Sequence, residues 1–324
     1  MSDPREASVS ATEMQSLRQD RAFYLRSRGV IALTGSGNVE VLITSLQALM
    51  GNSLEPLMTK GVLCHRVSER GEVLSDHFVI PHEGALLIDC AKNQLQEAVA
   101  AIAKCVESEG CSVSDVSDQW RVFGELPDQS TFDNGAPFLK CVDPRWHMGA
   151  RILRPASLPE SYAWGSEKKW AGHAMKLGFL PSTGLLSMVN VSPSLTVVEL
   201  GLHALGLVDS GRLNSDLQEV LKAPQKLISR RLLPLRLEPN SKVFSAMAGH
   251  TVTAGDVELG NVILHEGLYG LVLVHLEPWR AAQAAGQVLR CCDQTVLITW
   301  PSWLAQESRG RGGPDAMADQ PRRL

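Results

Sequence analysis

The sequence predicts an α+β protein that ends in a small antiparallel β-barrel. In the first two-thirds of the chain, short apolar runs alternate with stretches in which apolar residues recur at helical spacing. From Arg230 onward, short strand-like runs are separated by glycines, as is typical of a small barrel or sandwich (232–237, 257–264, 270–276, 295–300). Apolar residues make up 44% and charged residues 20% of the 324 residues, a balance that predicts a folded core.

The first predicted helix follows a short strand. Residues 30–34 form an apolar run, and apolar residues then recur at helical spacing (Val39, Leu42, Ile43, Leu46, Met50). We expect this helix to begin near Asn38, which is a favourable N-cap. The glycine-rich turn before it lacks the third glycine of a dinucleotide-binding loop, because position 40 is Glu. The pattern therefore favours a plain strand–turn–helix unit.

Further elements follow in order. Residues 72–80 and 85–89 are predicted to pair as a hairpin, and a helical stripe comes next (Leu95, Val99, Ile102, Val106). Residues 119–124 read as a strand before a polar loop through Asp133-Asn134-Gly135. We expect an irregular, tryptophan-containing region over 155–181, and helical or mixed structure over 196–208 and 213–221.

Charge and cysteine content narrow the class of protein. The net charge is −4 with both signs mixed along the chain, so no nucleic-acid or membrane surface is predicted. No apolar run approaches the roughly 20 residues of a membrane span. The seven cysteines are odd in number and scattered, which favours a reducing compartment over a disulfide framework. The polar N-terminus carries too many acidic residues for a typical transit peptide.

Changes in composition and in the spacing of apolar residues along the chain predict four segments. We expect a flexible N-terminal arm over 1–22 and an α+β body over 23–228. A barrel is expected over 229–304, and a disordered tail, rich in glycine and arginine, over 305–324.

Five short patterns occur in a fixed order along the chain: Gly71-Glu72-Val73-Leu74-Ser75-Asp76, Asp143-Pro144-Arg145 with Gly149 and Arg151, Arg230-Arg231-Leu232-Leu233-Pro234, Gly270-Leu271-Val272-Leu273, and Pro301-Ser302-Trp303. Through these patterns, residues from about 30 to 304 resemble the YgfZ/GcvT-like folate-binding family, which includes mitochondrial iron–sulfur cluster assembly factors related to the glycine-cleavage T protein. The resemblance implies a GcvT-like folate-binding-type body, a folate-sized cavity and tetrahydrofolate as a candidate cofactor. It also implies a mitochondrial location and protein partners, either iron–sulfur assembly proteins or a mitochondrial complex.

The chain also differs from this family in the motifs that carry the family's chemistry. The signature K-G-C-Y-x-G-Q-E falls on residues 210–217, where only Gly211 is kept and Arg212 stands in place of the cysteine. Arginine cannot supply a thiolate. The family's T-N-D pattern is lost near 47–49, and its basic stretch has become acidic over 105–111. These losses argue against aminomethyl or methyl transfer and indicate a pseudoenzyme.

Three residues are candidates for ligand binding: Asp76, Arg145 and Arg151. The two arginines could hold a carboxylate, such as a folate glutamate tail, through forked hydrogen bonds. The alternative is that they form structural ion pairs that join two parts of the fold. No metal site is predicted, because the adjacent Cys291 and Cys292 have no further ligands at metal-binding spacing.

Two functions follow from these observations. The first is an accessory factor in mitochondrial iron–sulfur protein maturation that acts without a catalytic thiol. The second is a non-catalytic subunit or scaffold of a larger mitochondrial complex, derived from such a factor.

We predict that no cysteine is essential; Cys141, close before Asp143, is the best candidate for a substitute thiol. Trp164 and Trp170, near Lys168 and Lys169, either bind a planar ring or cover an edge of the core.

Overall fold

The computed structural model describes residues 22–35, 39–58, 60–107, 110–127, 138–158, 164–188, 194–209, 211, 213, 215–222, 228–238 and 247–304. Several sequence predictions therefore lie outside the described residues, among them the arm over 1–21, the N-cap Asn38, the loop over 133–135, Arg212 and the tail.

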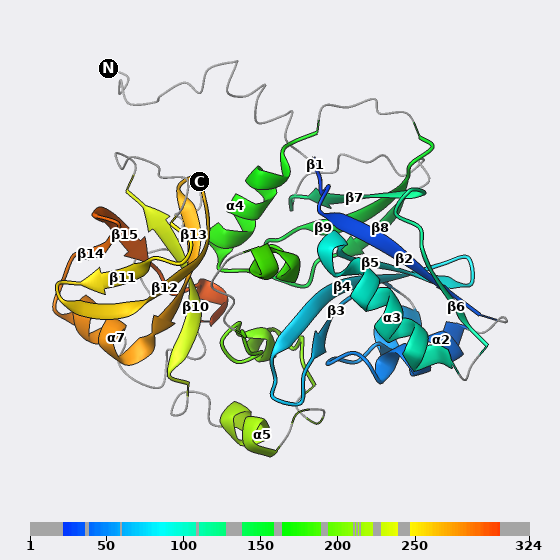
Figure 1. The fold of residues 1–324 in the computed structure, drawn as a ribbon, viewed down its shortest axis with the longest axis horizontal. Coiled ribbons are helices and arrows are strands. Elements are labelled where there is room, and N and C mark those ends of the chain that lie inside the picture. Colours follow the sequence, from blue (N-terminus) through cyan, green and yellow to red (C-terminus); the bar gives the residue numbers. More distant parts are fainter. Residues whose placement is uncertain are drawn as a thin grey trace, which may run out of the picture.

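A five-stranded antiparallel sheet forms one half of the body. Its order is β3 (Val62–Val67), β4 (Val73–His82), β5 (Ala85–Ala91), β2 (Arg28–Thr34) and β6 (Ser112–Asp115). Helices α2 (Val39–Gln47) and α3 (Leu95–Val106) cover its outer face (Figure 1). The predicted stripes account for this packing: α3 buries Leu95, Ala98, Ile102 and Val106 at helical spacing.

The predicted hairpin is confirmed with a tighter turn than expected. β4 continues through Pro81, which pairs with Leu86, so only two residues remain between β4 and β5. These are Glu83 and Gly84, with φ values of 48° and 79°. Two successive residues of positive φ are typical of the two-residue turns that suit the twist of antiparallel strands.

A second, four-stranded sheet lies against the inner face of the first. Its order is β1 (Ala22–Tyr24), β7 (Trp120–Glu125), β9 (Ala150–Pro155) and β8 (Leu139–Val142). Inner-face residues of both sheets share one core cluster, which includes Phe78 and Ile80 from β4 and Val122 and Leu153 from β7 and β9. The space between the two sheets is therefore filled by packed side chains.

The expectation of an irregular region over 155–181 was wrong in part, because helix α4 (Glu167–Leu177) lies within it. Ser166 caps the helix through its side chain, and Gly178 ends it with φ 84°. The buried residues Trp170, Ala174 and Met175 are too few to show clear periodicity in a segment that also contains three lysines. Residues 202–205 form a 3₁₀ helix, and 215–222 form helix α5, as the mixed expectation allowed.

The C-terminal strands close into a six-stranded antiparallel barrel, as predicted. The order is β10 (Arg230–Leu237), β13 (Tyr269–His275), β12 (Val257–Glu266), β11 (Thr251–Ala254), β14 (Leu289–Cys291) and β15 (Gln294–Ile298). The sequence did not predict β11 and β14, which have four and three residues, nor helix α7 (Leu276–Ala284). Figure 1 shows the barrel on one side of α4 and the two sheets on the other.

Helix α4 and residues 301–304 join the barrel to the body. The Trp303 ring stacks on Phe179 at 4.8 Å between centroids, and Trp303 Nε1 donates to the Leu177 carbonyl at 2.9 Å. Arg230 at the start of β10 forms an ion pair with Glu199 at 2.5 Å. The closing Pro301-Ser302-Trp303 pattern is therefore part of the contact between the barrel and the rest of the fold.

Candidate functional site

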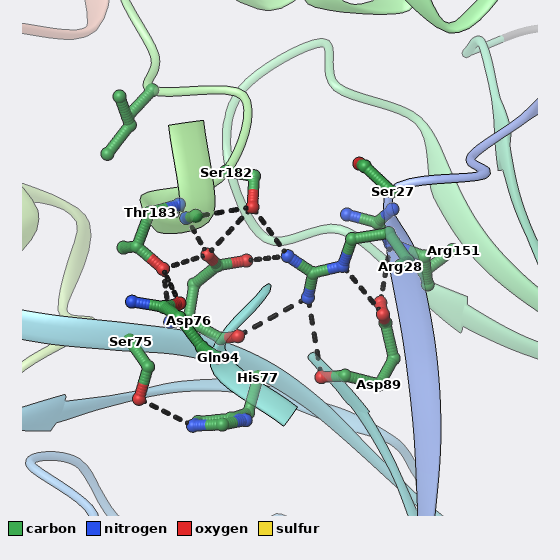
Figure 2. A network of polar contacts seen from close by, with 12 residues as sticks. Ser27, Arg28, Ser75, Asp76, His77, Asp89, Gln94, Arg151, Ser182 and Thr183 are labelled. Carbon is green, nitrogen blue, oxygen red and sulfur yellow. Dashed lines mark hydrogen bonds and ion pairs between the residues drawn. The ribbon is translucent and has the colours of Figure 1, made fainter. Parts of the chain in front are cut away.

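Three charged side chains from adjacent strands meet on the inner face of the first sheet. Side chains alternate along a strand, so Arg28, Asp76 and Asp89 point to the same face as the core residues Val30, Phe78 and Leu87. Arg28 lies between the two carboxylates: Nη1 is 2.7 Å from Asp76 Oδ2, and Nε is 2.7 Å from Asp89 Oδ1. Figure 2 shows this arrangement.

Asp76 receives further hydrogen bonds from the start of the 3₁₀ helix over Thr183–Met188. The Thr183 backbone N–H donates to Asp76 Oδ1 at 2.7 Å, and the Thr183 hydroxyl lies 2.6 Å from the same oxygen (Figure 2). Arg28 Nη1 also donates to Ser182 Oγ at 3.0 Å. Protein groups therefore occupy both oxygens of Asp76.

This environment fixes the charge of Asp76. Burial by itself would raise the pKa of Asp76, but the Arg28 guanidinium and the hydrogen bonds from Thr183 outweigh it and hold the pKa well below its ordinary value. A carboxylate with so low a pKa stays ionised and is a weak proton acceptor at neutral pH. The geometry does not support Asp76 as a general base.

Arg151 also belongs to this buried group. Its Nε lies 3.2 Å from Asp89 Oδ2, and its guanidinium sits over the Phe78 ring at 4.5 Å and near Trp170 at 5.9 Å. None of its three nitrogens has a hydrogen-bond partner among the described residues. Burial lowers the pKa of Arg151. The ion pair joins β9 of one sheet to β5 of the other.

The Arg145 guanidinium is bound by Asp143 in its own loop and by the backbone of Leu180. Nε and Nη2 bind the Asp143 carboxylate at 3.0 and 2.6 Å, and Nη1 donates to the Leu180 carbonyl at 3.0 Å. The forked geometry predicted for a ligand carboxylate is thus present, but here the carboxylate belongs to Asp143.

A small cavity lies beside these pairs. It measures about 20 Å³ and is lined by His65, Asp76, Arg145, Thr183 and five apolar residues (Val73, Phe179, Leu180, Leu200, Leu202). His65 Nδ1 is buried there without a hydrogen-bond partner among the described residues. A cavity of this size holds roughly one water molecule.

Tetrahydrofolate, the cofactor that the resemblance implies, does not fit this cavity. Pockets for ligands of that size enclose on the order of 300–1,000 Å³. The polar groups that could bind it, on Asp76 and Arg145, are already paired within the chain. Among the residues that the structure describes, the folate-sized cavity expected from the sequence is therefore not present at this position.

Four of the seven cysteines are buried, namely Cys64, Cys90, Cys141 and Cys291. Burial raises the pKa of Cys90, Cys141 and Cys291 to about 12. Cys141 packs against Gly61, where an added Cβ would lie 2.7 Å from its sulfur. Such thiols are almost entirely protonated at neutral pH, so they are poor nucleophiles. Cys292 is exposed at the turn between β14 and β15.

The structure connects two of the three candidate residues, Asp76 and Arg151, through two residues that sequence reasoning missed, Arg28 and Asp89. Asp89 interrupts the apolar run Leu86-Leu87-Ile88, and a carboxylate in such a strand is a signal of a buried ion pair. Trp170 is buried against Gly124 and thus covers part of the core, which was one of the two alternatives proposed for it.

Within the described ranges, no three His, Cys, Asp or Glu side chains are placed to hold a metal ion. No helix among those described is long and apolar enough to cross a bilayer.

Comparison with known proteins agrees with this architecture. The solved structure of glycine cleavage system aminomethyltransferase T from Bartonella henselae matches with a TM-score of 0.56 and 14% identity, over 90% of this chain and 89% of that one. The chain has a GcvT-like fold. Residues 230–306 match the family model of the CAF17 C-terminal beta-barrel domain, which confirms the predicted type of the last domain.

Two other comparisons add little. A heterotetrameric sarcosine oxidase from Corynebacterium sp. U-96, in complex with pyrrole 2-carboxylate, covers 45% of this chain and 86% of that one, with 14% identity and a TM-score of 0.28. A search of curated protein sequences gives no significant match. The comparisons thus define the GcvT-like fold and the CAF17-type barrel.

Proposed function

We propose that this protein is an accessory factor in mitochondrial iron–sulfur protein maturation and that it works without a catalytic thiol or a bound folate. One observation carries the proposal: the inner face of a GcvT-like fold with a CAF17-type barrel is closed by the chain's own ion pairs. Its buried thiols have raised pKa values, which supports a role without thiol chemistry. We infer that the factor acts through protein contacts.

The test is loss of the protein in its own cells, followed by complementation. We expect the activity of iron–sulfur enzymes to fall while the amount of their polypeptides is unchanged, and the tagged protein to lie in mitochondria. Full rescue by the native chain and by Cys141→Ser is expected. A cytosolic location, or unchanged iron–sulfur enzyme activity, would contradict the proposal.

A second candidate is a structural subunit of a larger mitochondrial complex. The same closed site favours it, since a scaffold needs neither a cavity nor a reactive group. Native purification separates the two functions. A subunit would elute in a stoichiometric complex that falls apart on its removal, whereas an accessory factor would leave complexes intact and lower cluster content.

A further inference from the structure

The hairpin of β14 and β15, on the side of the barrel away from the two sheets, ends in a tight turn that contains a cysteine (Figure 1). Cys291 pairs with Gln294, so Cys292 and Asp293 are the two residues of the turn. Their φ values are 47° and 63°, and two successive residues of positive φ are typical of such turns. Glycine and asparagine favour this conformation, whereas other residues rarely adopt it. A cysteine held there is a reason to ask what its side chain does.

The two thiols of this hairpin differ in exposure. Cys291 is 1% exposed and faces the barrel interior, whereas Cys292 is exposed to solvent. Burial, and then the neighbouring Cys292 with which it shares a side-chain hydrogen bond, raises the pKa of Cys291 to about 12. The Cys291 thiol therefore stays protonated at neutral pH, and it is the thiolate that attacks a disulfide. Cys292 is the thiol of this pair that a reagent in solution meets.

An internal disulfide between Cys291 and Cys292 is disfavoured. Consecutive Cα atoms are about 3.8 Å apart across a trans peptide bond, and no peptide bond among the described residues is cis. The Cα atoms of protein disulfides usually lie about 4.4–6.8 Å apart, so a disulfide between adjacent residues is strained. A disulfide between Cys292 and a small molecule therefore persists, because the protonated neighbouring thiol does not displace the small molecule.

Two exposed charges of opposite sign lie close to Cys292 along the chain. Arg290 precedes it by two residues on β14, and Asp293 follows it in the turn. Neither side chain forms an ion pair with another residue that the structure describes. The residues paired with Arg290 on the two neighbouring strands are Thr253 and Thr295, which carry no charge. The turn therefore presents one cation and one anion beside an accessible sulfur.

Glutathione carries the groups that match this arrangement. In this tripeptide, the central cysteine is flanked by a γ-linked glutamate, which bears an α-ammonium group, and by a glycine that ends in a carboxylate. The Arg290 guanidinium can bind the glycine carboxylate through forked hydrogen bonds, and Asp293 can pair with the α-ammonium group. Two residues of a strand span about 7 Å, so the guanidinium and the Cys292 sulfur lie within the length of one tripeptide.

We propose that Cys292 is a site of reversible glutathione attachment, at which Arg290 and Asp293 recognise the tripeptide. The Cys292 thiolate, which has lost its proton to water, attacks one sulfur of glutathione disulfide. A bond forms between the Cys292 sulfur and that sulfur, the disulfide bond of the reagent breaks, and the departing glutathione thiolate takes up a proton from water. The Cys292 sulfur is oxidised and one glutathione is released in reduced form. An excess of reduced glutathione reverses the step.

The other cysteines that are not fully buried are less available. Cys105 is half-buried, its thiol donates to the Ser45 carbonyl at 2.9 Å, and burial raises its pKa. Cys111 is half-buried against Gly35, where an added Cβ would lie 3.0 Å from the Cys111 sulfur. We therefore expect a single site of attachment. The inference does not depend on the proposed function, since it requires only a compartment that contains glutathione.

Intact mass spectrometry of the full-length protein after treatment with glutathione disulfide tests the site. We expect one attached glutathione per chain, located on Cys292 by peptide mapping and removed by dithiothreitol. Cys292→Ser should remain unmodified, and Cys291→Ala should be modified at a rate within about twofold of the native chain. Attachment mainly to another cysteine would overturn the proposal. So would an internal disulfide between Cys291 and Cys292, recognised by the loss of two hydrogen atoms without added glutathione.

A second reagent separates recognition of glutathione from simple exposure of the thiol. Bis-hydroxyethyl disulfide lacks the charged groups of glutathione, so it reports the reactivity of the thiol alone. Arg290→Met should lower the rate with glutathione disulfide about two- to fivefold more than the rate with bis-hydroxyethyl disulfide. Arg236→Met, at an exposed position on β10, is the matched control and should change neither rate. Equal effects of Arg290→Met on both reagents would show an exposed thiol without a glutathione site and would contradict the proposal.

Discussion

The buried network around Arg28 and the exposed ion pair between Lys168 and Glu266 hold charge in different surroundings. In the network, each carboxylate meets an arginine within hydrogen-bond distance, and the polar groups are enclosed between two sheets. Lys168 and Glu266 lie 3.5 Å apart, and their side chains are 77% and 38% exposed. Removing one member of a buried pair leaves a charge without water, whereas removing one member of an exposed pair leaves the other solvated. The comparison therefore assigns the network to the stability of the fold.

The largest expected effect is on the network. Arg28→Met leaves Asp76 and Asp89 buried without their shared partner, and such a loss costs about 3–5 kcal/mol of unfolding free energy. Denaturation by urea measures it. The matched control is Glu266→Gln, which removes the partner of Lys168 from an exposed pair and should cost less than about 1 kcal/mol. Similar costs for both variants would remove the distinction between buried and exposed charge.

The pH dependence of stability tests burial near the same network. Burial lowers the pKa of His65 to about 4 and that of His77 to about 3. In the unfolded chain both side chains have a pKa of about 6.5. Between these values the unfolded state binds protons that the folded state does not, so stability falls as pH falls from about 6.5 to 4, by up to roughly 2–3 kcal/mol per pH unit.

A variant tests whether the two buried histidines cause this dependence of stability on pH. His77→Gln should reduce it by about half, since one of the two groups is removed. His250→Gln, at an exposed position, is the control and should leave the slope unchanged. Below about pH 4, Asp76 adds to the loss, because its lowered pKa stabilises the fold only while the carboxylate is ionised. A flat profile between pH 6.5 and 4 would show that the histidines are not buried as described.

The smallest expected effect concerns the thiols. Cys292 is exposed and should react with a thiol reagent at least about a hundredfold faster than Cys64, Cys90, Cys141 and Cys291, which are buried. Cys292→Ser should remove the fast phase. In complementation, Cys141→Ser should retain function at normal abundance. Loss of function without loss of protein would mean that a buried thiol takes part in chemistry.

Local pattern was enough to predict much of the fold. The β4–β5 hairpin, α3 and four barrel strands follow from periodicity and glycine placement, because each depends on neighbouring residues. The Arg28 network was not predicted, since its members pair across 48 and 61 residues and no local rule links them. Arg145 was identified, with a structural ion pair as one of its two alternatives, but Asp143 was not named as the partner in that pair. The sequence also could not reveal that the candidate residues Asp76 and Arg145 are paired with the chain's own side chains.

Titration of the full-length protein with tetrahydrofolate tests the central claim most directly, that the cavity lined by Asp76 and Arg145 is closed to a ligand of that size. Calorimetry with a folate-binding GcvT protein as positive control is the measurement. The closed network and the cavity of about 20 Å³ predict no saturable heat at millimolar ligand. Saturable one-to-one binding with a Kd below about 100 μM, weakened by Asp76→Asn, would show that the site opens and would contradict the account.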